Sequence, residues 1–480
     1  MGYPKIIISA ISGGSGKTII SLGIIRSLIK RGYSIAPFKK GPDYIDAAWM
    51  ALAANQPCYN LDTFLIPSDI LLYSFFNYSK FSDISIIEGN RGIYDSIDVN
   101  GSTSTADLAK LLKSSVILVL DCTKITRTMA AVVSGLINFD KNLEISGVIL
   151  NRIAGARHES ILRNSIEEHT SIKVLGAMPK LKNVFPERHM GLVPNFEHLW
   201  AHESLEMISE KTEKYVNIDA IIEKCKNNSF NDNSYNISNS CHNSIISYKS
   251  INTSNKPIIA IAKDSAFQFY YQENIDALEA AGAKIIYISP LSDKDIPDVD
   301  AIYLGGGFPE THAKQLDLNH SFKESIKKMI MNGLPVYAEC GGLIYLGKEI
   351  ILEDENFSMA DILPLRFHIS KRPKGHGYTI LNVEKDNPFF EKGQVIKGHE
   401  FHYSSIIDSK ENIVNSKKNN TIDIYFAFDV ERGVGIKKQK DGIIYKNVLA
   451  TYTHIHALGC LSWAPAVIKQ AIFYKNNKEC

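Results

Sequence analysis

Short runs rich in Ile and Val alternate along the first half of the chain with amphipathic segments of helical length. This alternation is typical of a parallel β-sheet that is covered by helices on both faces. Apolar residues recur at helical spacing over residues 17–30, and Arg31-Gly32 follows as a helix end, so a helix is predicted there. The predicted strands of this half are residues 5–9, 34–38, 84–87, 116–121, 145–150 and 174–177.

A polar segment at residues 226–256 interrupts this pattern. Asn and Ser dominate it, and it has too little apolar surface to order itself, which predicts an interdomain linker. A second alternation follows, with helices predicted at residues 271–281 and 322–332. Its predicted strands are residues 258–262, 284–288, 301–304 and 335–338. The sequence therefore predicts an α/β protein with two doubly wound domains, residues 1–225 and 257–480, on either side of the linker.

The composition is that of an ordinary soluble protein of 480 residues, a length that favours two or three domains over a single core. Lys and Arg total 53 against 52 for Asp and Glu, and this balance gives no basic footprint for nucleic acid or a membrane surface. No apolar run approaches the roughly 20 residues that span a bilayer, and the start of the chain lacks a secretory signal pattern. We therefore expect a cytoplasmic protein that binds neither nucleic acid nor membranes. The sequence leaves the oligomeric state open, with a homodimer as one candidate assembly.

A Gly-rich segment, SGGSGKT at residues 12–18, separates the first predicted strand from the first predicted helix. In this position, backbone N–H groups and the helix N-terminus can wrap a triphosphate. Lys17 would neutralise phosphate charge, and the Thr18 hydroxyl would hold Mg²⁺. The strict pattern has Gly where Ile11 stands, and a Gly-rich turn without a ligand is the alternative, but the strand, loop and helix context favours the phosphate site. The predicted nucleotide-binding residues are Gly13, Gly14, Ser15, Gly16, Lys17 and Thr18.

Two carboxylates follow predicted strands in the same half of the chain, Asp43 in KGPDYID (residues 40–46) and Glu88 in IIEGN (residues 86–90). The carboxyl ends of parallel strands line one crevice, where Mg²⁺ would need oxygen ligands beside the Thr18 hydroxyl. Carboxylates at the start of loops are often only turn or cap residues. The phosphate loop favours the metal role, so Thr18, Asp43 and Glu88 are the predicted metal ligands.

Cys340 stands between a short predicted strand and a Gly-rich helix start in AECGGL, residues 338–343. A sharp turn there would expose the sulfur, and the helix N-terminus would favour its thiolate. The seven cysteines of the chain form no CxxC pair and no zinc-ligand spacing, so neither a disulfide framework nor a structural metal site is indicated. Cys340 is therefore the candidate nucleophile, with buried filler as the alternative role of a lone cysteine.

Two further segments supply partners for a catalytic thiol. The loop LGGGFPE, residues 304–310, follows another predicted strand, and the backbone N–H groups of Gly306 and Gly307 can form an oxyanion hole. Near the C-terminus, His454 and His456 would point to the same side of an extended segment and offer a general base. A lone His is more often structural, but the order of oxyanion loop, Cys turn and His favours thiol catalysis.

Taken together, these motifs resemble the cobyrinate a,c-diamide synthase family of ATP- and glutamine-dependent corrinoid amidotransferases, over nearly the whole chain. The motifs that carry the resemblance are GGSGKT (13–18), KGPDYID (40–46), EG (88–89), GIYD (92–95), LGGGFPE (304–310), AECGGL (338–343), GHEFHYS (398–404) and YTHIH (452–456). The resemblance implies an N-terminal P-loop domain of the dethiobiotin-synthetase type and a C-terminal class I glutaminase-like domain.

The resemblance also implies a reaction. Cys340, activated by His454, would release ammonia from glutamine, and ATP with Mg²⁺ would phosphorylate an acetate side chain that ammonia then converts to an amide. Asp46 is implied in positioning the substrate or Mg²⁺. His454 matches the His of the family's YxH signature, and His456, two residues on, could orient it, but the sequence leaves open which of the two is the base. The implied partners are small molecules: a tetrapyrrole carboxylate, glutamine and ATP.

Three alternative functions share part of these features. Nickel-sirohydrochlorin a,c-diamide synthases share the motifs, so the sequence barely separates the two macrocycles. A partitioning-type switch ATPase would have Lys where Ser12 stands, and it has no use for the Cys and His segments. A binding module that kept both folds without activity is disfavoured, because Lys17, Cys340 and His454 are intact.

Overall fold

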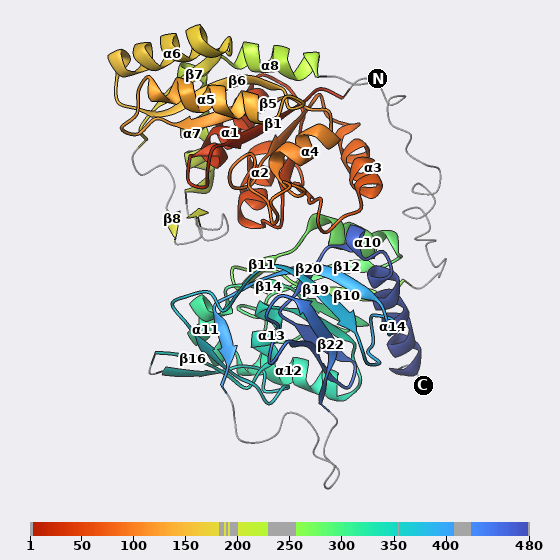
Figure 1. Ribbon diagram of the computed structural model, residues 1–480. Helices are drawn as coiled ribbons and strands as arrows, with labels where there is room; N and C mark the ends of the chain where they lie inside the picture. Colours follow the sequence, from red (N-terminus) through yellow and green to blue (C-terminus); the bar gives the residue numbers. More distant parts are fainter. Residues whose placement is uncertain are drawn as a thin grey trace. The chain divides into compact units, whose positions relative to one another are not determined.

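The computed structural model describes residues 3–181, 187–188, 191–192, 200–228, 256–353, 355–407 and 424–478 (Figure 1). The chain divides into two compact units, Met1–His242 and Asn243–Cys480. The expected linker lies outside the described residues apart from residues 226–228 and 256, and helix α8 (Ile218–Asn227) continues past the expected end of the first domain. The domain boundaries at residues 225 and 257 stay predictions.

The first unit contains a parallel seven-stranded sheet with the strand order β3-β2-β4-β1-β5-β6-β7. Its strands are β1 (Lys5–Ala10), β2 (Ile35–Lys40), β3 (Tyr59–Leu61), β4 (Ile84–Glu88), β5 (Val116–Asp121), β6 (Ile145–Ile153) and β7 (Val174–Pro179). Each strand predicted in this half has a counterpart, and β3 is an additional short strand. Because β1 lies between β4 and β5, with β2 beyond β4, the loops after β1, β2 and β4 meet at one edge of the sheet.

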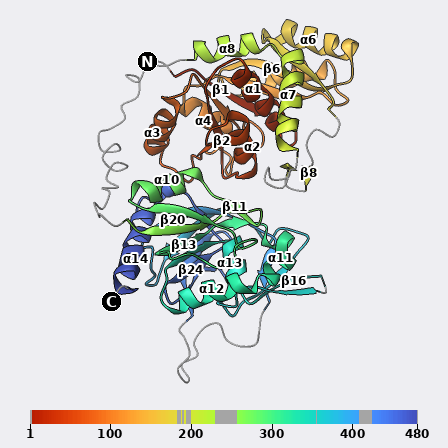
Figure 2. The ribbon, with the colours of Figure 1, turned by 180° about the vertical axis from the view of Figure 1, so that it is seen from behind.

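Helices lie on both sides of this sheet, as the alternation predicts (Figures 1 and 2). They are α1 (Lys17–Lys30), α2 (Ile45–Ala54), α3 (Ser68–Ser79), α4 (Thr105–Leu111), α5 (Thr128–Phe139), α6 (Ala156–Thr170), α7 (Ala201–Tyr215) and α8. Ile24 and Leu28 of α1 share a buried core cluster with Ile208 of α7. Two short strands, β8 (Glu187–Arg188) and β9 (Gly191–Leu192), pair antiparallel with each other.

The second unit contains a ten-stranded sheet with the order β12-β10-β13-β15-β24-β23-β22-β19-β20-β25. Its parallel half consists of β12 (Lys284–Ile288), β10 (Ile258–Ala262), β13 (Ala301–Leu304), β15 (Val336–Glu339) and β24 (Val448–Thr451). The first four of these match predicted strands. The antiparallel half, which the sequence analysis does not predict, consists of β23 (Lys440–Tyr445), β22 (Tyr425–Arg432), β19 (Gly375–Val383), β20 (Val395–His402) and β25 (His454–Ile455).

Smaller elements surround this sheet. Strand β11 (Phe267–Phe269) pairs with β14 (Gly306–Gly307), and β17 (Glu355–Ser358), β16 (Glu349–Leu352), β18 (Arg366–Ile369) and β21 (Ser404–Ile406) form a separate small sheet. The helices are α10 (Gln272–Ala280), α11 (Ala313–Leu318), α12 (His320–Met331), α13 (Gly341–Leu346) and α14 (Trp463–Lys478), with 3-10 turns η3 (Pro309–His312) and η4 (Ala457–Gly459). Within the described ranges, no helix combines the length and the apolar character needed to cross a membrane.

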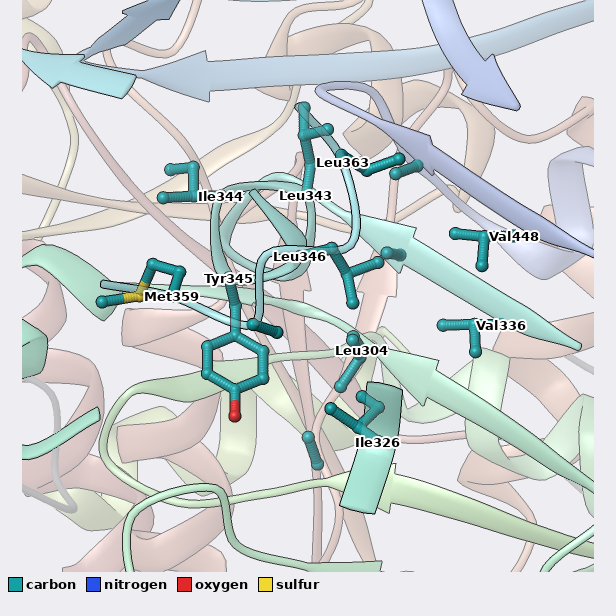
Figure 3. Close-up of a cluster of buried hydrophobic side chains, with 14 of the residues drawn as sticks. Leu304, Ile326, Val336, Leu343, Ile344, Tyr345, Leu346, Met359, Leu363 and Val448 are labelled. Carbon is teal, nitrogen blue, oxygen red and sulfur yellow. The ribbon is translucent and has the colours of Figure 1, made fainter. Parts of the chain in front are cut away.

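Helix α13 lies inside the core of the second unit, and every one of its residues is buried. Figure 3 shows Leu343 and Leu346 of this helix in one cluster with Leu304 of β13 and Val336 of β15. Close packing of this kind leaves little room for the helix to move. The residue before α13, Cys340, is therefore held at a fixed place beside the ends of β13 and β15.

Candidate active sites

The Gly-rich segment of the first unit joins β1 to α1 in a turn that requires glycine. Gly16 has a φ of 87°, and a Cβ atom there would lie 2.3 Å from Nδ2 of Asn151. Asn151, on β6, donates from Nδ2 to the carbonyl oxygen of Ser15 at 2.9 Å. Strand β6, which lies two strands away from β1 in the sheet, thus supports the loop, even though Ile11 departs from the strict pattern. Asn151 is not among the predicted site residues, and its signal in the sequence is a polar residue inside a largely apolar strand.

Thr18 and the predicted carboxylates meet at one edge of the sheet. Thr18 Oγ1 lies 2.8 Å from Glu88 Oε1 and 3.2 Å from Asp46 Oδ2. Asp43 Oδ1 accepts a hydrogen bond from the backbone N–H of Asp46 at 3.0 Å. The fold therefore brings together oxygen atoms from residues that are up to 70 positions apart in the sequence.

A lysine that the sequence analysis does not single out lies among these carboxylates. Lys39, near the end of β2, is 1% exposed. Its Nζ lies 2.7 Å from Glu88 Oε1 and 2.8 Å from Asp46 Oδ2, with Asp43 Oδ2 at 3.5 Å. Burial alone would lower the pKa of Lys39, but the three carboxylates hold it well above its ordinary value. The available signal was the lysine pair that ends an otherwise apolar buried strand.

The donor atoms at this edge fit a hard cation. Burial raises the pKa of Glu88 and, together with the Asp46 carboxylate, raises that of Asp43 to about 7. Glu88 Oε2 is buried and has no hydrogen-bond partner among the described residues. Among all the residues that the structure describes, no group of three or more His, Cys, Asp or Glu side chains is arranged to hold a metal ion. A cation here would therefore need the Thr18 hydroxyl and phosphate oxygens to complete its coordination.

In the second unit, Cys340 occupies a strained turn between β15 and α13. Its φ of 45° and ψ of −93° lie in a region that residues other than Gly rarely adopt. The Cys340 N–H donates to Thr451 O at 2.7 Å, and the Gly342 N–H donates to Gly305 O at 3.0 Å. These bonds join the turn to the end of β24 and to the loop after β13. A strained strand-to-helix turn of this kind is typical of a nucleophile elbow.

The Gly-rich loop and His454 adjoin this turn. A Cβ atom at Gly341 would lie 3.0 Å from the backbone nitrogen of Gly307. A Cβ atom at Gly306 would lie 2.3 Å from Cε1 of His454, so only glycine lets the imidazole approach the loop so closely. The loop, the Cys turn and one of the two histidines that the sequence analysis combines are therefore neighbours in the second unit.

The two candidate bases have different surroundings. His454 Nδ1 lies 3.6 Å from Glu339 Oε2, and its ring stacks on that of His399 with centroids 4.9 Å apart. His456 Nε2 lies 3.6 Å from Glu273 Oε2 on α10. His454 is thus the histidine next to the Cys340 turn, whereas His456 is turned toward α10. Glu339 and His399 are further residues that the sequence analysis does not single out, although both stand inside quoted motifs.

Burial disfavours the thiolate form of Cys340. Cys340 is 5% exposed, and burial, with the Glu310 and Glu339 carboxylates, raises the pKa of its thiol above the ordinary value. The backbone N–H of Gly341 acts in the opposite direction and is outweighed. The helix-terminus effect expected from the sequence is therefore present but is not decisive, because α13 starts inside the core. Burial also raises the pKa of Glu310 to about 7.

Two protein-family models match the chain. The CobQ/CobB/MinD/ParA nucleotide binding domain matches residues 6–193. The CobB/CobQ-like glutamine amidotransferase domain matches residues 258–460. The first unit is therefore an ATP-binding type of domain and the second a glutamine amidotransferase domain, which confirms the predicted fold class and the small-molecule nature of the substrates.

Curated relatives match the chain over nearly its whole length. The cobyrinate a,c-diamide synthase of Archaeoglobus fulgidus is 37% identical over 474 residues, which cover 98% of each chain. That of Magnetococcus marinus is 36% identical over 467 residues, which cover 96% of each chain. That of Listeria innocua is 38% identical over 456 residues, which cover 94% of this chain and 96% of the relative. Identity at this level across both units confirms the resemblance seen in the motifs, and the chain belongs to the cobyrinate a,c-diamide synthase family.

Proposed function

We propose that this protein uses ATP to amidate the a and c acetate side chains of cobyrinate in cobalamin biosynthesis, with glutamine or free ammonia as the nitrogen donor. The names of the relatives support the macrocycle. One observation carries the chemistry: a phosphate loop with clustered carboxylates in the first unit is combined with a strained Cys turn beside a His in the second. The protein is then a carbon–nitrogen ligase that works in the cytoplasm, where ATP and glutamine are available.

The second unit supplies ammonia. Cys340 Sγ attacks the side-chain amide carbon of glutamine while His454 takes the thiol proton, because the buried thiol is neutral at rest. The backbone N–H groups of Gly306 and Gly307 stabilise the oxyanion. The C–N bond breaks, His454 gives the proton to the leaving nitrogen, and ammonia departs. Water then hydrolyses the thioester, which releases glutamate and restores the thiol.

The first unit activates the acid, since a carboxylate is a poor acyl donor until its oxygen becomes a leaving group. The loop from Gly13 to Thr18 binds the ATP phosphates, with the Lys17 ammonium against the γ-phosphate. An oxygen of the substrate carboxylate attacks the γ-phosphorus and ADP leaves, which gives an acyl phosphate. Ammonia then attacks the acyl carbon, phosphate departs, and an amide remains.

Mg²⁺ fits this site as the partner of ATP, where it would neutralise phosphate charge. The Thr18 hydroxyl and the carboxylates of Asp43 and Glu88 would hold it, and Asp46 would position the substrate or the metal. The buried Glu88 Oε2, which lacks a hydrogen-bond partner among the described residues, supports this assignment. Lys39 balances the charge of the three carboxylates.

The product of the reaction tests this proposal. With ATP, Mg²⁺ and glutamine present, we expect mass spectrometry to show conversion of cobyrinate to its a,c-diamide, with ADP and glutamate formed alongside. Nickel-sirohydrochlorin under the same conditions is the alternative substrate, and faster turnover of it would overturn the choice of macrocycle. ATP hydrolysis without amidation of either macrocycle would favour a switch ATPase.

Separate replacement of the two histidines should identify the base. His454→Ala is expected to lower the kcat of glutamine hydrolysis by at least about 100-fold, the usual contribution of general-base catalysis. His456→Ala should cost much less, because His456 faces Glu273 rather than the nucleophile turn. Steady-state glutaminase assays of both variants, with unfolding temperatures as a check on folding, measure the difference. An inactive His456→Ala protein beside a nearly native His454→Ala protein would reverse the two roles.

A further inference from the structure

We propose that Glu339, the residue before the nucleophile, is a positioning residue for His454. Its carboxylate orients the imidazole and balances the positive charge that the ring gains when it takes the Cys340 proton. This role rests on the parts that Cys340 and His454 play in the proposed function. It would make Glu339 the third member of the catalytic arrangement, supplied by the residue next to the nucleophile itself.

Hydrogen bonds hold the Glu339 carboxylate in one orientation inside the sheet. Its side chain is 1% exposed. Oε1 accepts hydrogen bonds from the backbone N–H of Ile455 and from the Tyr337 hydroxyl, both at 3.1 Å. Oε2 accepts a hydrogen bond from the Tyr303 hydroxyl at 2.9 Å. A buried carboxylate with donors on both oxygens is a fixed group rather than a mobile one.

The same oxygen, Oε2, faces the imidazole. His454 Nδ1 lies 3.6 Å from it, while the Gly306 backbone packs against the Cε1 edge of the ring. An Nδ1–H directed at the carboxylate leaves Nε2 with the lone pair that a general base needs. The present distance is longer than a hydrogen bond, and contacts of this kind tighten when substrate binds and charge develops.

A buried imidazolium needs a counter-charge. Because burial raises the pKa of the Cys340 thiol, proton transfer to His454 creates a new ion pair inside the core. A buried charge without a partner is costly. A fixed carboxylate beside His454 lowers that cost in the transition state, as in other enzymes where a third group orients the base.

The other described titratable groups near His454 are neutral or face elsewhere. His399, on β20, stacks on the ring with 17° between the ring planes. Burial and the neighbouring histidines hold the pKa of His399 well below its ordinary value, so this ring stays neutral. Tyr271 lies beyond it, with its hydroxyl 3.1 Å from His399 Nδ1. His456 follows along the chain and lies beside Glu273.

A split between kcat and KM distinguishes a positioning role from simple support of the fold. Without the carboxylate, kcat for glutamine hydrolysis should fall, because the ring accepts the thiol proton less well, while KM should stay nearly native. A side chain that only supports the fold would change KM along with kcat.

The test variant is Glu339→Gln, which keeps the size of the side chain. We expect kcat for glutamine hydrolysis to fall by about 100-fold with little change in KM. Glu273→Gln is the matched control, because Glu273 is equally buried and lies at the same 3.6 Å from the other histidine, His456. The control should keep the native kcat and the native KM.

Each result of this test either supports or overturns the proposed role of Glu339. A folded Glu339→Gln protein with native kcat overturns the proposal, and so does a loss of activity that appears in KM rather than in kcat. If its unfolding temperature shows that Glu339→Gln does not fold, Tyr303→Phe tests the same contact by removing the hydrogen bond to the oxygen that faces His454. That variant should lose about fivefold in kcat at unchanged KM, and a native kcat would overturn the proposal.

Cys340→Ala, assayed in parallel, separates this proposal from the function on which it rests. If Cys340→Ala still hydrolyses glutamine at the native rate, the proposed function itself fails. If Cys340→Ala is inactive while Glu339→Gln is native, only the role of Glu339 fails.

Discussion

Replacement of Cys340 by alanine is expected to abolish amidation with glutamine and to leave amidation with a high concentration of free ammonia near the native rate. In the proposed mechanism the thiol forms the thioester, so without it no ammonia is released, and glutamine hydrolysis should fall by at least about 1,000-fold. The proposed ATP-binding residues belong to the other unit and need only ammonia. Quantification of the amide product with each nitrogen source measures the two activities separately.

Cys460→Ala is the matched control for this variant. Cys460 is buried to the same extent in the same unit, but its Sγ accepts a hydrogen bond from Gln394 Nε2 at 3.2 Å and has no proposed role. We expect glutamine-dependent amidation to persist in the control. Glutamine hydrolysis at the native rate by Cys340→Ala would show that another group is the nucleophile. Loss of ammonia-dependent amidation as well would show that Cys340 supports the fold of the whole chain.

Most parallel strands of the two sheets are predictable from the sequence because most of them are buried on both faces. Strands β1 and β4 are buried along their whole length and therefore appear as continuous apolar runs. Strand β19 is different, because buried and partly exposed residues alternate in its second half and its first half carries Gly, His and Tyr. A strand with one solvated face leaves a weaker pattern. Strand β19 of the antiparallel half escapes prediction for this reason.

The site residues that the sequence analysis identifies stand in contiguous motifs, whereas the others act through partners far along the chain. Lys39 contacts Glu88, 49 residues away. Asn151 supports a phosphate loop that lies 136 residues earlier, and Glu339 binds a backbone N–H 116 residues later. The order of the strands in each sheet brings these residues together, and no short stretch of sequence reveals that order. The local signal for Lys39 and Glu339 is a charged side chain at the end of an apolar strand, where burial requires a partner.

The protonation state of Cys340 illustrates a different limit. A helix N-terminus favours a thiolate when it is considered alone. Burial opposes the charge, and the Glu310 and Glu339 carboxylates oppose it further. The burial of the Cys340 turn and the charges of the neighbouring side chains decide whether the thiol is ionised. Both are properties of the tertiary structure.

Replacement of Lys17 by alanine should stop amidation with both nitrogen sources. Lys17 begins α1 and is 7% exposed, so its ammonium is held at the phosphate loop. Burial and the nearby Lys39 lower the pKa of Lys17, and a bound phosphate would stabilise its charged form. Phosphoryl transfer depends on positive charge around the γ-phosphate, so amide formation should fall by at least about 1,000-fold. ADP and amide, measured in the same assay, report the loss.

Lys30→Ala is the matched control for Lys17→Ala, because Lys30 ends the same helix and pairs at the surface with Glu206 at 2.7 Å. Surface pairs of this kind contribute at most about 1 kcal/mol, so the control should keep native turnover. Cys340 in the Lys17→Ala protein should still be labelled by a diazoketone analogue of glutamine, because that reaction needs only the second unit. Native ammonia-dependent amidation in Lys17→Ala would mean that the loop does not act on ATP, and the proposed ATP site would be wrong. Loss of the labelling as well would mean that the two sites depend on each other, because Lys17 contributes no atom to the thiol chemistry.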